Sequence, residues 1–323
     1  MRAAVRSRYG PPDVVRIEEV PTPEPGPGEL LVRVHATTVN RTDCAYRGGT
    51  PAVTRLLFGW PHPRVQVLGT EFAGTVERAG NEVTAFSAGD RVFGYVEGSF
   101  GAHAEFLTVP QHGSVAHVPD DVDLTTAAAA TEGAHYALAF ARVARIRAGQ
   151  DVLVLGATGG IGSAAVRLLT AGGVRVTAVA REHADVVAGL GADRVITAPA
   201  EGVPDDGQRY DAVLDAVGRS TFGRVRRLLA PSGVYVSSEL GPGAQNIGLA
   251  ALWPVMRGRH VRFPFPLHDQ AMIRRIAGLL ADGRFRPVID RRYSLDRIIE
   301  AYEYVESGRK LGNVVIQVTD DEG

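Results

Sequence analysis

The segment at residues 152–166 constrains the fold of this chain more than any other. It reads VLVLGATGGIGSAAV, in which four apolar residues end at Gly156 and an alanine-rich helical pattern follows. A dinucleotide pyrophosphate requires a strand, a glycine turn and a helix in this order, because backbone N–H groups approach the phosphates and the helix N-terminus carries partial positive charge. Aligned on G-x-G-x-x-G, the turn has Ala157, Gly159 and Gly162. The segment predicts a nucleotide-binding α/β domain.

Composition narrows the function classes. The 323 residues exceed one ordinary domain, and 45% of them are hydrophobic, which suits packed cores. Lys and Arg number 35 against 36 Asp and Glu, a balance that argues against a nucleic-acid partner or a polybasic membrane contact. The single cysteine, Cys44, excludes an intrachain disulfide and suits a reducing compartment. No signal-peptide pattern and no bilayer-length apolar run is visible, so we expect a cytoplasmic protein with no membrane partner.

The order of elements predicts two domains. Residues 1–118 read as short strands broken by Gly and Pro, which is typical of a β-barrel-like domain. Residues 119–265 begin with a helix expected from Thr125 to Arg145 and then alternate strands and helices, which predicts a parallel, doubly wound sheet. Residues 266–323 add two amphipathic helices and a strand, and we expect them to return to the first domain. The strands expected in the second domain are residues 152–155, 174–179, 194–196, 212–215, 233–237 and 260–263.

Five segments, in order, carry a resemblance to a known family. They are VNRTD at residues 39–43, GTEFAG with its continuation at residues 69–83, GDRV to GAHAE at residues 89–105, the glycine turn, and LGNVVI at residues 311–316. On these residues the chain resembles the medium-chain dehydrogenase/reductase superfamily, closest to its zinc-independent quinone oxidoreductase branch. The resemblance covers essentially the whole chain. It implies a GroES-like β-barrel-type catalytic domain, a Rossmann cofactor domain and a homodimer through a sheet edge, for which we expect Val261 to Phe263.

Two positions within these segments bear on metal chemistry. Zinc-dependent members of the superfamily have a cysteine at the position that matches Asn40 and a histidine at the position that matches Thr70. An amide and a neutral hydroxyl are not normal zinc ligands, and one cysteine cannot form a structural zinc site. We therefore expect no metal. Glu71 keeps the position of the family's acid, and without a metal we expect it to hydrogen-bond within the fold.

Without a Lewis acid, the feasible hydride acceptor is a quinone or a double bond conjugated to a carbonyl. The protein then has to orient the cofactor and to offer hydrogen bonds to the acceptor oxygen. Asn40 is the first candidate donor, and a role in stabilising its own turn is the alternative. The other catalytic candidates are Tyr46, Glu132 and His135. Glu132 and His135 are three residues apart, which suits an acid/base pair on one helix face, although a structural ion pair is the commoner outcome.

Cofactor residues are expected at the carboxyl ends of the parallel strands, where ligands collect in such sheets. Arg181 follows the second strand, no acid closes that strand, and a guanidinium can bind a 2′-phosphate, which predicts NADPH. Glu182 is the competing residue, since it suits the ribose hydroxyl of NADH. By resemblance, Val217, Gly218 and Asn313 belong to the cofactor site. The expected contacts are Thr158, Gly159, Gly160, Ile161, Gly162, Arg181, His183, Val217, Gly218, Glu239, Leu240, Phe263 and Asn313.

The leading hypothesis is therefore an NADPH-dependent, zinc-independent oxidoreductase of the quinone oxidoreductase or enoyl reductase kind. Its partner is a small-molecule quinone or α,β-unsaturated carbonyl. Two alternatives stay open: a metal-free alcohol/ketone dehydrogenase and a non-catalytic NADPH-binding protein. Substrate choice depends on loops such as residues 48–63, whose conformation the sequence alone does not determine.

Overall fold

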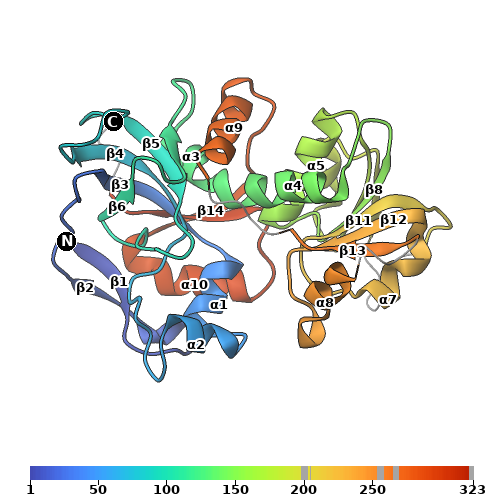
Figure 1. Cartoon of the computed structure of the whole chain (residues 1–323), viewed down its shortest axis with the longest axis horizontal. Helices are drawn as coiled ribbons and strands as arrows, with labels where there is room; N and C mark the ends of the chain where they lie inside the picture. The colour runs from blue at the N-terminus through green and yellow to red at the C-terminus, as the bar shows by residue number, and fades with distance from the viewer. Residues whose placement is uncertain (198–202, 204, 253–257, 265–268, 320–323) are drawn as a thin grey trace. The chain divides into compact units, whose positions relative to one another are not determined.

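The computed structural model describes residues 1–323 except 198–202, 204, 253–257, 265–268 and 320–323. The chain forms two compact units, coloured along the sequence in Figure 1. The first unit is Met1–Thr131 together with His268–Gly323, and the second is Glu132–Leu267. Among the described residues, no helix has both the length and the apolar character that crossing a bilayer requires.

The first unit is built around a mostly antiparallel sheet in the order β14-β15-β3-β4-β5-β7, in which β6 also pairs with β3. The long β3 pairs with three strands. One of its edges pairs with β4, and the other edge pairs first with β6 and then with β15, which curls the sheet toward a barrel. The strands of this unit are β1 (Arg2–Arg6), β2 (Val15–Glu19), β3 (Glu29–Val39), β4 (Glu71–Ala79), β5 (Arg91–Tyr95), β6 (Phe106–Pro110), β7 (Val115–His117), β14 (Ile289–Ser294) and β15 (Asn313–Gln317).

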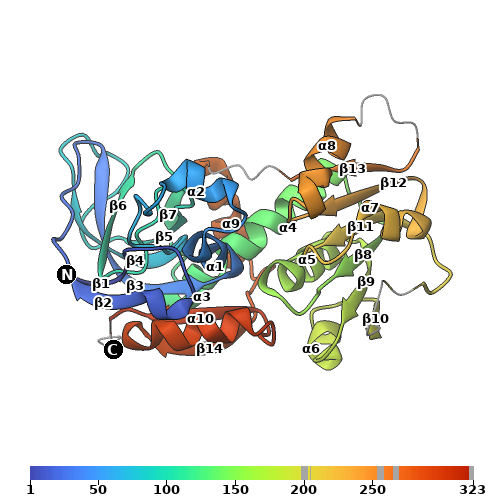
Figure 2. The ribbon, with the colours of Figure 1, turned by 90° about the horizontal axis from the view of Figure 1, so that it is seen from below.

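Helices from both ends of the chain complete the first unit. Buried side chains of α10, among them Ile298 and Tyr302, pack with β-strand residues such as Phe72 in one apolar core. The helix α10 also contacts α1, and both views place the two side by side (Figures 1 and 2). The helices are α1 (Arg41–Gly48), α2 (Val53–Phe58), α3 (Leu124–Ala129), α9 (Gln270–Ala281) and α10 (Ile298–Glu306), with 3₁₀ turns η1 (Pro12–Val14) and η5 (Leu295–Arg297).

The second unit contains a parallel six-stranded sheet in the order β10-β9-β8-β11-β12-β13. Helix α5 lies on one face of this sheet, and α7 and α8 lie on the other (Figure 1). The strands are β8 (Asp151–Leu155), β9 (Arg175–Ala180), β10 (Arg194–Thr197), β11 (Tyr210–Asp215), β12 (Leu229–Ser237) and β13 (His260–Arg262). The helices and 3₁₀ turns are α4 (Thr131–Ala144), α5 (Gly160–Ala171), α6 (Ala184–Gly189), α7 (Phe222–Val225), η2 (Arg226–Leu228), η3 (Pro242–Ala244) and α8 (Gln245–Ala251). The predicted doubly wound parallel sheet is confirmed.

The structure differs from the sequence-based expectation between the two units. The single helix expected from Thr125 to Arg145 is two helices, because Ala130 closes α3 with a bond from its N–H to the Ala127 carbonyl and α4 starts afresh at Thr131. Helix α3 packs on β3, β4 and β5, so these residues belong to the first unit rather than to a domain that begins at residue 119. The expected boundary at 265/266 falls among residues outside the described part of the chain.

Candidate active site

The glycine turn between β8 and α5 is packed too tightly for side chains at two of its positions. A Cβ on Gly162 would lie 2.1 Å from the carbonyl oxygen of Gly156, and Gly156 itself has a φ of +75°. At Gly159, in contrast, the nearest heavy atom would be 3.7 Å away, so that glycine leaves open space above the turn. Ala157 is buried, and its N–H donates to Val179 O at 3.1 Å. Its φ is not in the positive region, so the backbone at this first position does not require glycine. The first N–H groups of α5 have no intrahelical acceptor and suit an anion.

The strand order places the other predicted cofactor residues on either side of this turn. Chain order reverses between β8 and β11, which is the switch point where dinucleotides bind in such sheets. Arg181 and His183 follow β9 on one side, and both are exposed, as is Glu182. On the other side, the residues that follow β11, β12 and β13 are Val217, Gly218, Glu239, Leu240 and Phe263.

The loops on the second side interlock. A Cβ on Gly218 would lie 2.0 Å from Cγ of Glu239, and a Cβ on Gly156 would lie 1.8 Å from Cγ2 of Val217. The turn after β8 therefore contacts the turn after β11, and the turn after β11 contacts the turn after β12. Asn313 lies in the first unit, where its backbone and side-chain N–H groups both donate to Val288 O, at 2.8 and 3.0 Å.

The first turn of α4 packs against the cofactor turn within the second unit. A Cβ on Gly133 would lie 2.8 Å from Gly160 O, so the start of α4 contacts the first residue of α5. Glu132 and His135 flank this contact, and both side chains are buried. The His135 ring lies 5.8 Å from the ring of Tyr136. The structure thus brings these two candidates close to the glycine turn.

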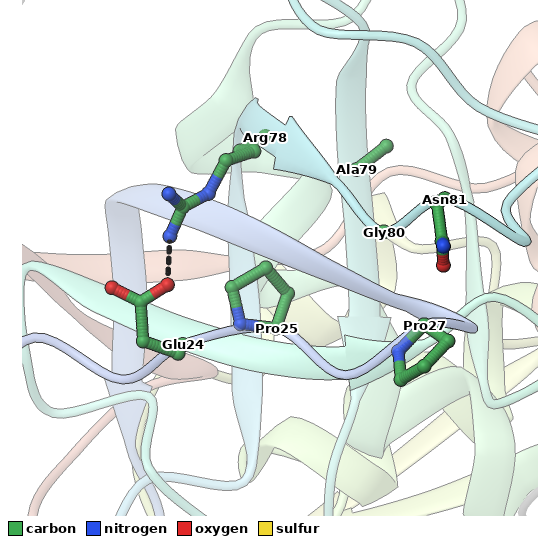
Figure 3. Close-up of a pocket in the computed structure, with 7 residues that line it drawn as sticks. All are labelled: Glu24, Pro25, Pro27, Arg78, Ala79, Gly80 and Asn81. Carbon is green, nitrogen blue, oxygen red and sulfur yellow. Dashed lines mark hydrogen bonds and ion pairs between the residues drawn. The ribbon is translucent and has the colours of Figure 1, made fainter.

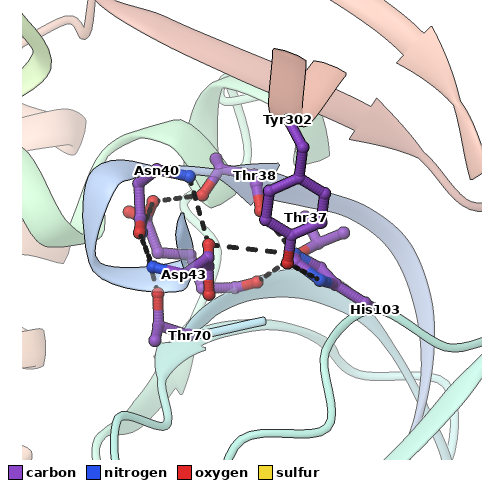
Figure 4. Close-up of polar contacts among 8 residues, drawn as sticks. Thr37, Thr38, Asn40, Asp43, Thr70, His103 and Tyr302 are labelled. Atoms are coloured by element: carbon purple, nitrogen blue, oxygen red, sulfur yellow. Dashed lines mark hydrogen bonds and ion pairs between the residues drawn. The ribbon is translucent and has the colours of Figure 1, made fainter. Parts of the chain in front are cut away.

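In the first unit, Asn40 forms a capping box at the start of α1. Its side-chain oxygen accepts from Asp43 N at 2.8 Å, and the Asp43 carboxylate accepts from Asn40 N at 3.1 Å. This oxygen assignment turns the Asn40 amide nitrogen toward Thr70 Oγ1, 2.8 Å away, as Figure 4 shows. The role of Asn40 in its own turn, an alternative left open by the sequence, is therefore present in the structure.

Glu71 is the centre of a buried polar cluster. Its side chain is fully buried and accepts hydrogen bonds from the hydroxyls of Thr38 and Thr131, the latter at 2.6 Å, while the Asn40 amide lies 3.5 Å away. The expectation that Glu71 hydrogen-bonds within the fold is confirmed. Asn40 and Thr70, at the two metal-ligand positions of zinc-dependent relatives, thus contact each other, and the Asn40 amide also reaches Glu71. We call Asn40, Thr70 and Glu71 the Asn40 cluster.

The donor set of the Asn40 cluster does not fit a zinc ion. An amide N–H points at the Thr70 hydroxyl, and only Glu71 among the three offers a ligand of a usual kind. Across the described part of the chain, no three His, Cys, Asp or Glu side chains are placed to hold a metal together. Cys44 does not change this, since burial and the nearby Asp43 raise the pKa of its thiol.

Tyr46 stands at the C-terminal end of α1 in an aromatic cluster. Its ring meets Phe58 and Phe100 edge to face, with centroids 4.8 and 4.7 Å away. The Tyr46 hydroxyl donates to Glu97 at 3.3 Å, and Tyr95 donates to the other oxygen of Glu97 at 2.9 Å. Burial, reinforced by Glu97, raises the pKa of Tyr46, so this side chain retains its proton at neutral pH. The sequence analysis did not identify Glu97 as a site residue. The only local feature that could have indicated it is that an acidic residue follows the end of β5.

His103 links the first strands to α10. Its Nε2 lies 2.8 Å from Thr38 O, and because a carbonyl can only accept, Nε2 carries the proton and Nδ1 accepts from the Tyr302 hydroxyl at 3.3 Å (Figure 4). Burial lowers the pKa of His103 to about 4. At neutral pH His103 is therefore an uncharged residue of the packed interior.

This buried histidine makes stability depend on pH. The folded pKa lies below the unfolded value near 6.5, so the unfolded chain binds more protons between these values and stability falls as pH falls. We expect the wild type to lose about 2 kcal/mol of unfolding free energy more than His103→Gln does between pH 7 and pH 5. The raised pKa of nearby Asp43 acts in the opposite direction but is common to both proteins. Equal pH slopes in urea unfolding of the two proteins would contradict the assignment.

One surface pocket lies apart from all these residues. It has a volume of about 340 Å³ and is open to solvent beside an ion pair of 2.5 Å between Arg78 and Glu24 (Figure 3). The lining residues are Glu24, Pro25, Pro27, Arg78, Ala79, Gly80 and Asn81. None of the predicted site residues lines it, and we assign it no role.

Comparison with known proteins places this geometry in a family. The alcohol dehydrogenase GroES-like domain family matches residues 26–120, and the zinc-binding dehydrogenase family matches residues 190–316. A quinone oxidoreductase from Pseudomonas aeruginosa is 32% identical over 327 residues, which cover 95% of this chain and 97% of the relative. The predicted GroES-like and Rossmann fold class is confirmed.

Two further relatives carry names that mention the reduced cofactor. The chloroplastic NADPH-dependent alkenal/one oxidoreductase of Arabidopsis thaliana is 28% identical over 333 residues, covering 98% of this chain and 79% of the relative. A mycobacterial protein solved in complex with NADPH superposes with a TM-score of 0.82 at 28% identity, covering 98% of this chain and 100% of that one.

Proposed function

This chain is a quinone oxidoreductase-like member of the medium-chain dehydrogenase/reductase superfamily, and we propose that it transfers hydride from NADPH to a quinone or an α,β-unsaturated carbonyl without zinc. The observation that carries the proposal is the Asn40 cluster. Residues at the metal-ligand positions hydrogen-bond to one another, so no Lewis acid is supplied where zinc-dependent relatives hold theirs. An acceptor that is already conjugated needs no such activation.

In this proposal, residues of the chain bind the cofactor, orient its nicotinamide and protonate the reduced acceptor. The bound cofactor supplies a hydride to the β-carbon of the acceptor. The turn from Thr158 to Gly162 holds the pyrophosphate through its backbone N–H groups, and the loops after β11 and β12 orient the nicotinamide. The Tyr46 hydroxyl, which keeps its proton beside Glu97, is the proposed proton donor to the enolate. Enone, NADPH and one proton then give the saturated ketone and NADP⁺.

An isotope experiment tests the transfer step directly. With an enone acceptor and NADPH deuterated at C4 on the transferred face, the product ketone should carry one deuterium at its β-carbon. The solvent proton should appear at the α-carbon instead. Deuterium that stays entirely in the oxidised nucleotide with either C4 epimer, or reduction of the carbonyl itself to an alcohol, would reject the proposed reaction.

Arg181 is the proposed determinant of NADPH selectivity. Arg181→Ala is expected to raise KM for NADPH by about ten- to a hundredfold, the equivalent of one charged hydrogen-bonding partner, and to leave KM for NADH nearly unchanged. Arg175→Ala is the matched control, because Arg175 is exposed at the opposite end of β9 and pairs with Asp151. Equal changes for both cofactors, or a wild type that prefers NADH, would assign the ribose to Glu182 instead.

We also propose a homodimer that pairs the sheets of two second units through β13. Among the described strands, β13 pairs only with β12, so its outer edge is available for a partner strand. Light scattering should give twice the mass of the 34.4 kDa chain at micromolar concentration. A single-chain mass over a wide concentration range would reject this arrangement.

We further propose the cytoplasm as the compartment of this protein, because the free thiol of Cys44 suits a reducing environment.

A further inference from the structure

We propose that Asp215 is a positioning residue that fixes the loops expected to hold the nicotinamide half of the cofactor. This inference rests on the proposed function. Asp215 is the last residue of β11, and its side chain is 1% exposed. It lies at the carboxyl end of the sheet, directly across the switch point from the glycine turn.

Four donors converge on the two oxygens of this carboxylate. Oδ1 accepts from the backbone N–H groups of Val217 at 3.1 Å and Gly218 at 2.8 Å. Oδ2 accepts from Ser220 N at 2.9 Å and from the Tyr235 hydroxyl at 3.0 Å. Three of the donors are backbone groups of the loop that follows β11. The side chain therefore sets the path of that loop in the way that a ligand orders a backbone nest.

The fourth donor ties this loop to the next one. Tyr235 is fully buried on β12, and burial, together with Asp215, raises the pKa of its hydroxyl, so it remains a donor. Two residues beyond it, the Ser237 hydroxyl accepts from Glu239 N at 3.2 Å. Glu239 in turn packs against Gly218, which has a φ of +68° and no room for a Cβ. By accepting a hydrogen bond from Gly218 N, Asp215 thereby holds Gly218 in contact with Glu239.

The strand order tells which half of the cofactor depends on this arrangement. The adenosine half belongs beside β9, where Arg181 lies, and the pyrophosphate belongs at the turn after β8. The nicotinamide half must then extend toward β11 and β12. Asp215 is buried and both of its oxygens accept hydrogen bonds from protein groups, so we expect no direct contact between its side chain and the cofactor. Its effect reaches the nicotinamide through the backbone of Val217 and Gly218.

Asp215→Asn tests this role, because an amide can accept at only one of the two positions and leaves two donors facing an N–H₂ group. We expect NADPH affinity to fall by about tenfold or more, measured by nucleotide fluorescence. Affinity for 2′-phospho-ADP-ribose, which lacks the nicotinamide, should stay within about twofold of the wild type. A role confined to general stability would weaken both ligands together, and unchanged NADPH affinity would also overturn the inference.

Two further variants keep the test decisive. Asp211→Asn is the matched control, because Asp211 sits at the other end of β11 and accepts from Asp151 N at 2.9 Å, so it should leave both affinities unchanged. If Asp215→Asn does not fold, Tyr235→Phe removes one donor only and should still weaken NADPH selectively. Equal NADPH affinity in Tyr235→Phe and wild type would then overturn the inference. A wild type that binds neither ligand would instead refute the proposed function.

Discussion

Gly162→Ala is expected to weaken NADPH binding by at least about a hundredfold, or roughly 2.7 kcal/mol. The added Cβ would lie 2.1 Å from Gly156 O and 2.9 Å from Ala157 Cα, both of them backbone atoms that cannot rotate away. The turn must therefore open, and the N–H groups that face the pyrophosphate move with it. This loss occurs although alanine is the better helix former. Fluorescence titration of NADPH measures the effect.

Gly159→Ala is the control for this prediction. Its Cβ would be 3.7 Å from the nearest heavy atom, so the fold should tolerate it and the free energy of unfolding should stay within about 1 kcal/mol. Any loss of NADPH affinity in this variant then reports direct approach of the cofactor to the turn. NADPH affinity in Gly162→Ala equal to that of the wild type would show that the cofactor does not bind at this turn.

Glu71→Ala is expected to lower the free energy of unfolding by about 3–5 kcal/mol. The substitution leaves the buried hydroxyls of Thr38 and Thr131 without their acceptor and opens a cavity. Glu77→Ala, on the same strand, removes only an exposed ion pair of 2.9 Å with Arg33 and should cost less than about 1 kcal/mol. Urea denaturation compares the two.

Comparing the wild type with Glu71→Ala in the presence of zinc separates a structural cluster from a metal site. If the Asn40 cluster is held by its own hydrogen bonds, added zinc should leave the stability of the wild type and of Glu71→Ala unchanged. A wild type that zinc stabilises and a Glu71→Ala variant that zinc does not would contradict the structural role assigned to Glu71.

The parts of the fold that follow from local pattern were predictable. The apolar run that ends at Gly156 identified β8 and the turn, because strand, glycine and helix are adjacent in sequence. The Gly and Pro turns of residues 1–118 likewise predicted short strands there, and β3 and β4 are two of the strands that the structure has in this range. It failed at Ala130, where the alanine-rich pattern continues but α3 ends against the sheet of the first unit. Tertiary packing, rather than helix propensity, decides that boundary.

The side-chain partners of the site were harder to predict because they are distant in sequence. Glu97 accepts a hydrogen bond from the Tyr46 hydroxyl, 51 residues away in sequence, and Asp215 accepts one from the Tyr235 hydroxyl, 20 residues away. No periodicity links such pairs. The sequence identified Asn40 and Thr70 as departures from a metal site, but only the structure shows that these two side chains hydrogen-bond to each other. At the positions where zinc-dependent relatives bind their metal, these two side chains therefore bind each other.

The central claim, metal-free hydride transfer from NADPH to a conjugated acceptor, is tested most directly by one acceptor screen. NADPH oxidation should be followed against quinones, enones, ketones, aldehydes and, in reverse with NADP⁺, secondary alcohols, with protein treated with a chelator and assayed for metal. The account predicts turnover of quinones or enones at an unchanged rate after chelation, with no stoichiometric zinc. Zinc-dependent turnover of alcohols, or NADPH binding without oxidation by any acceptor, would contradict it.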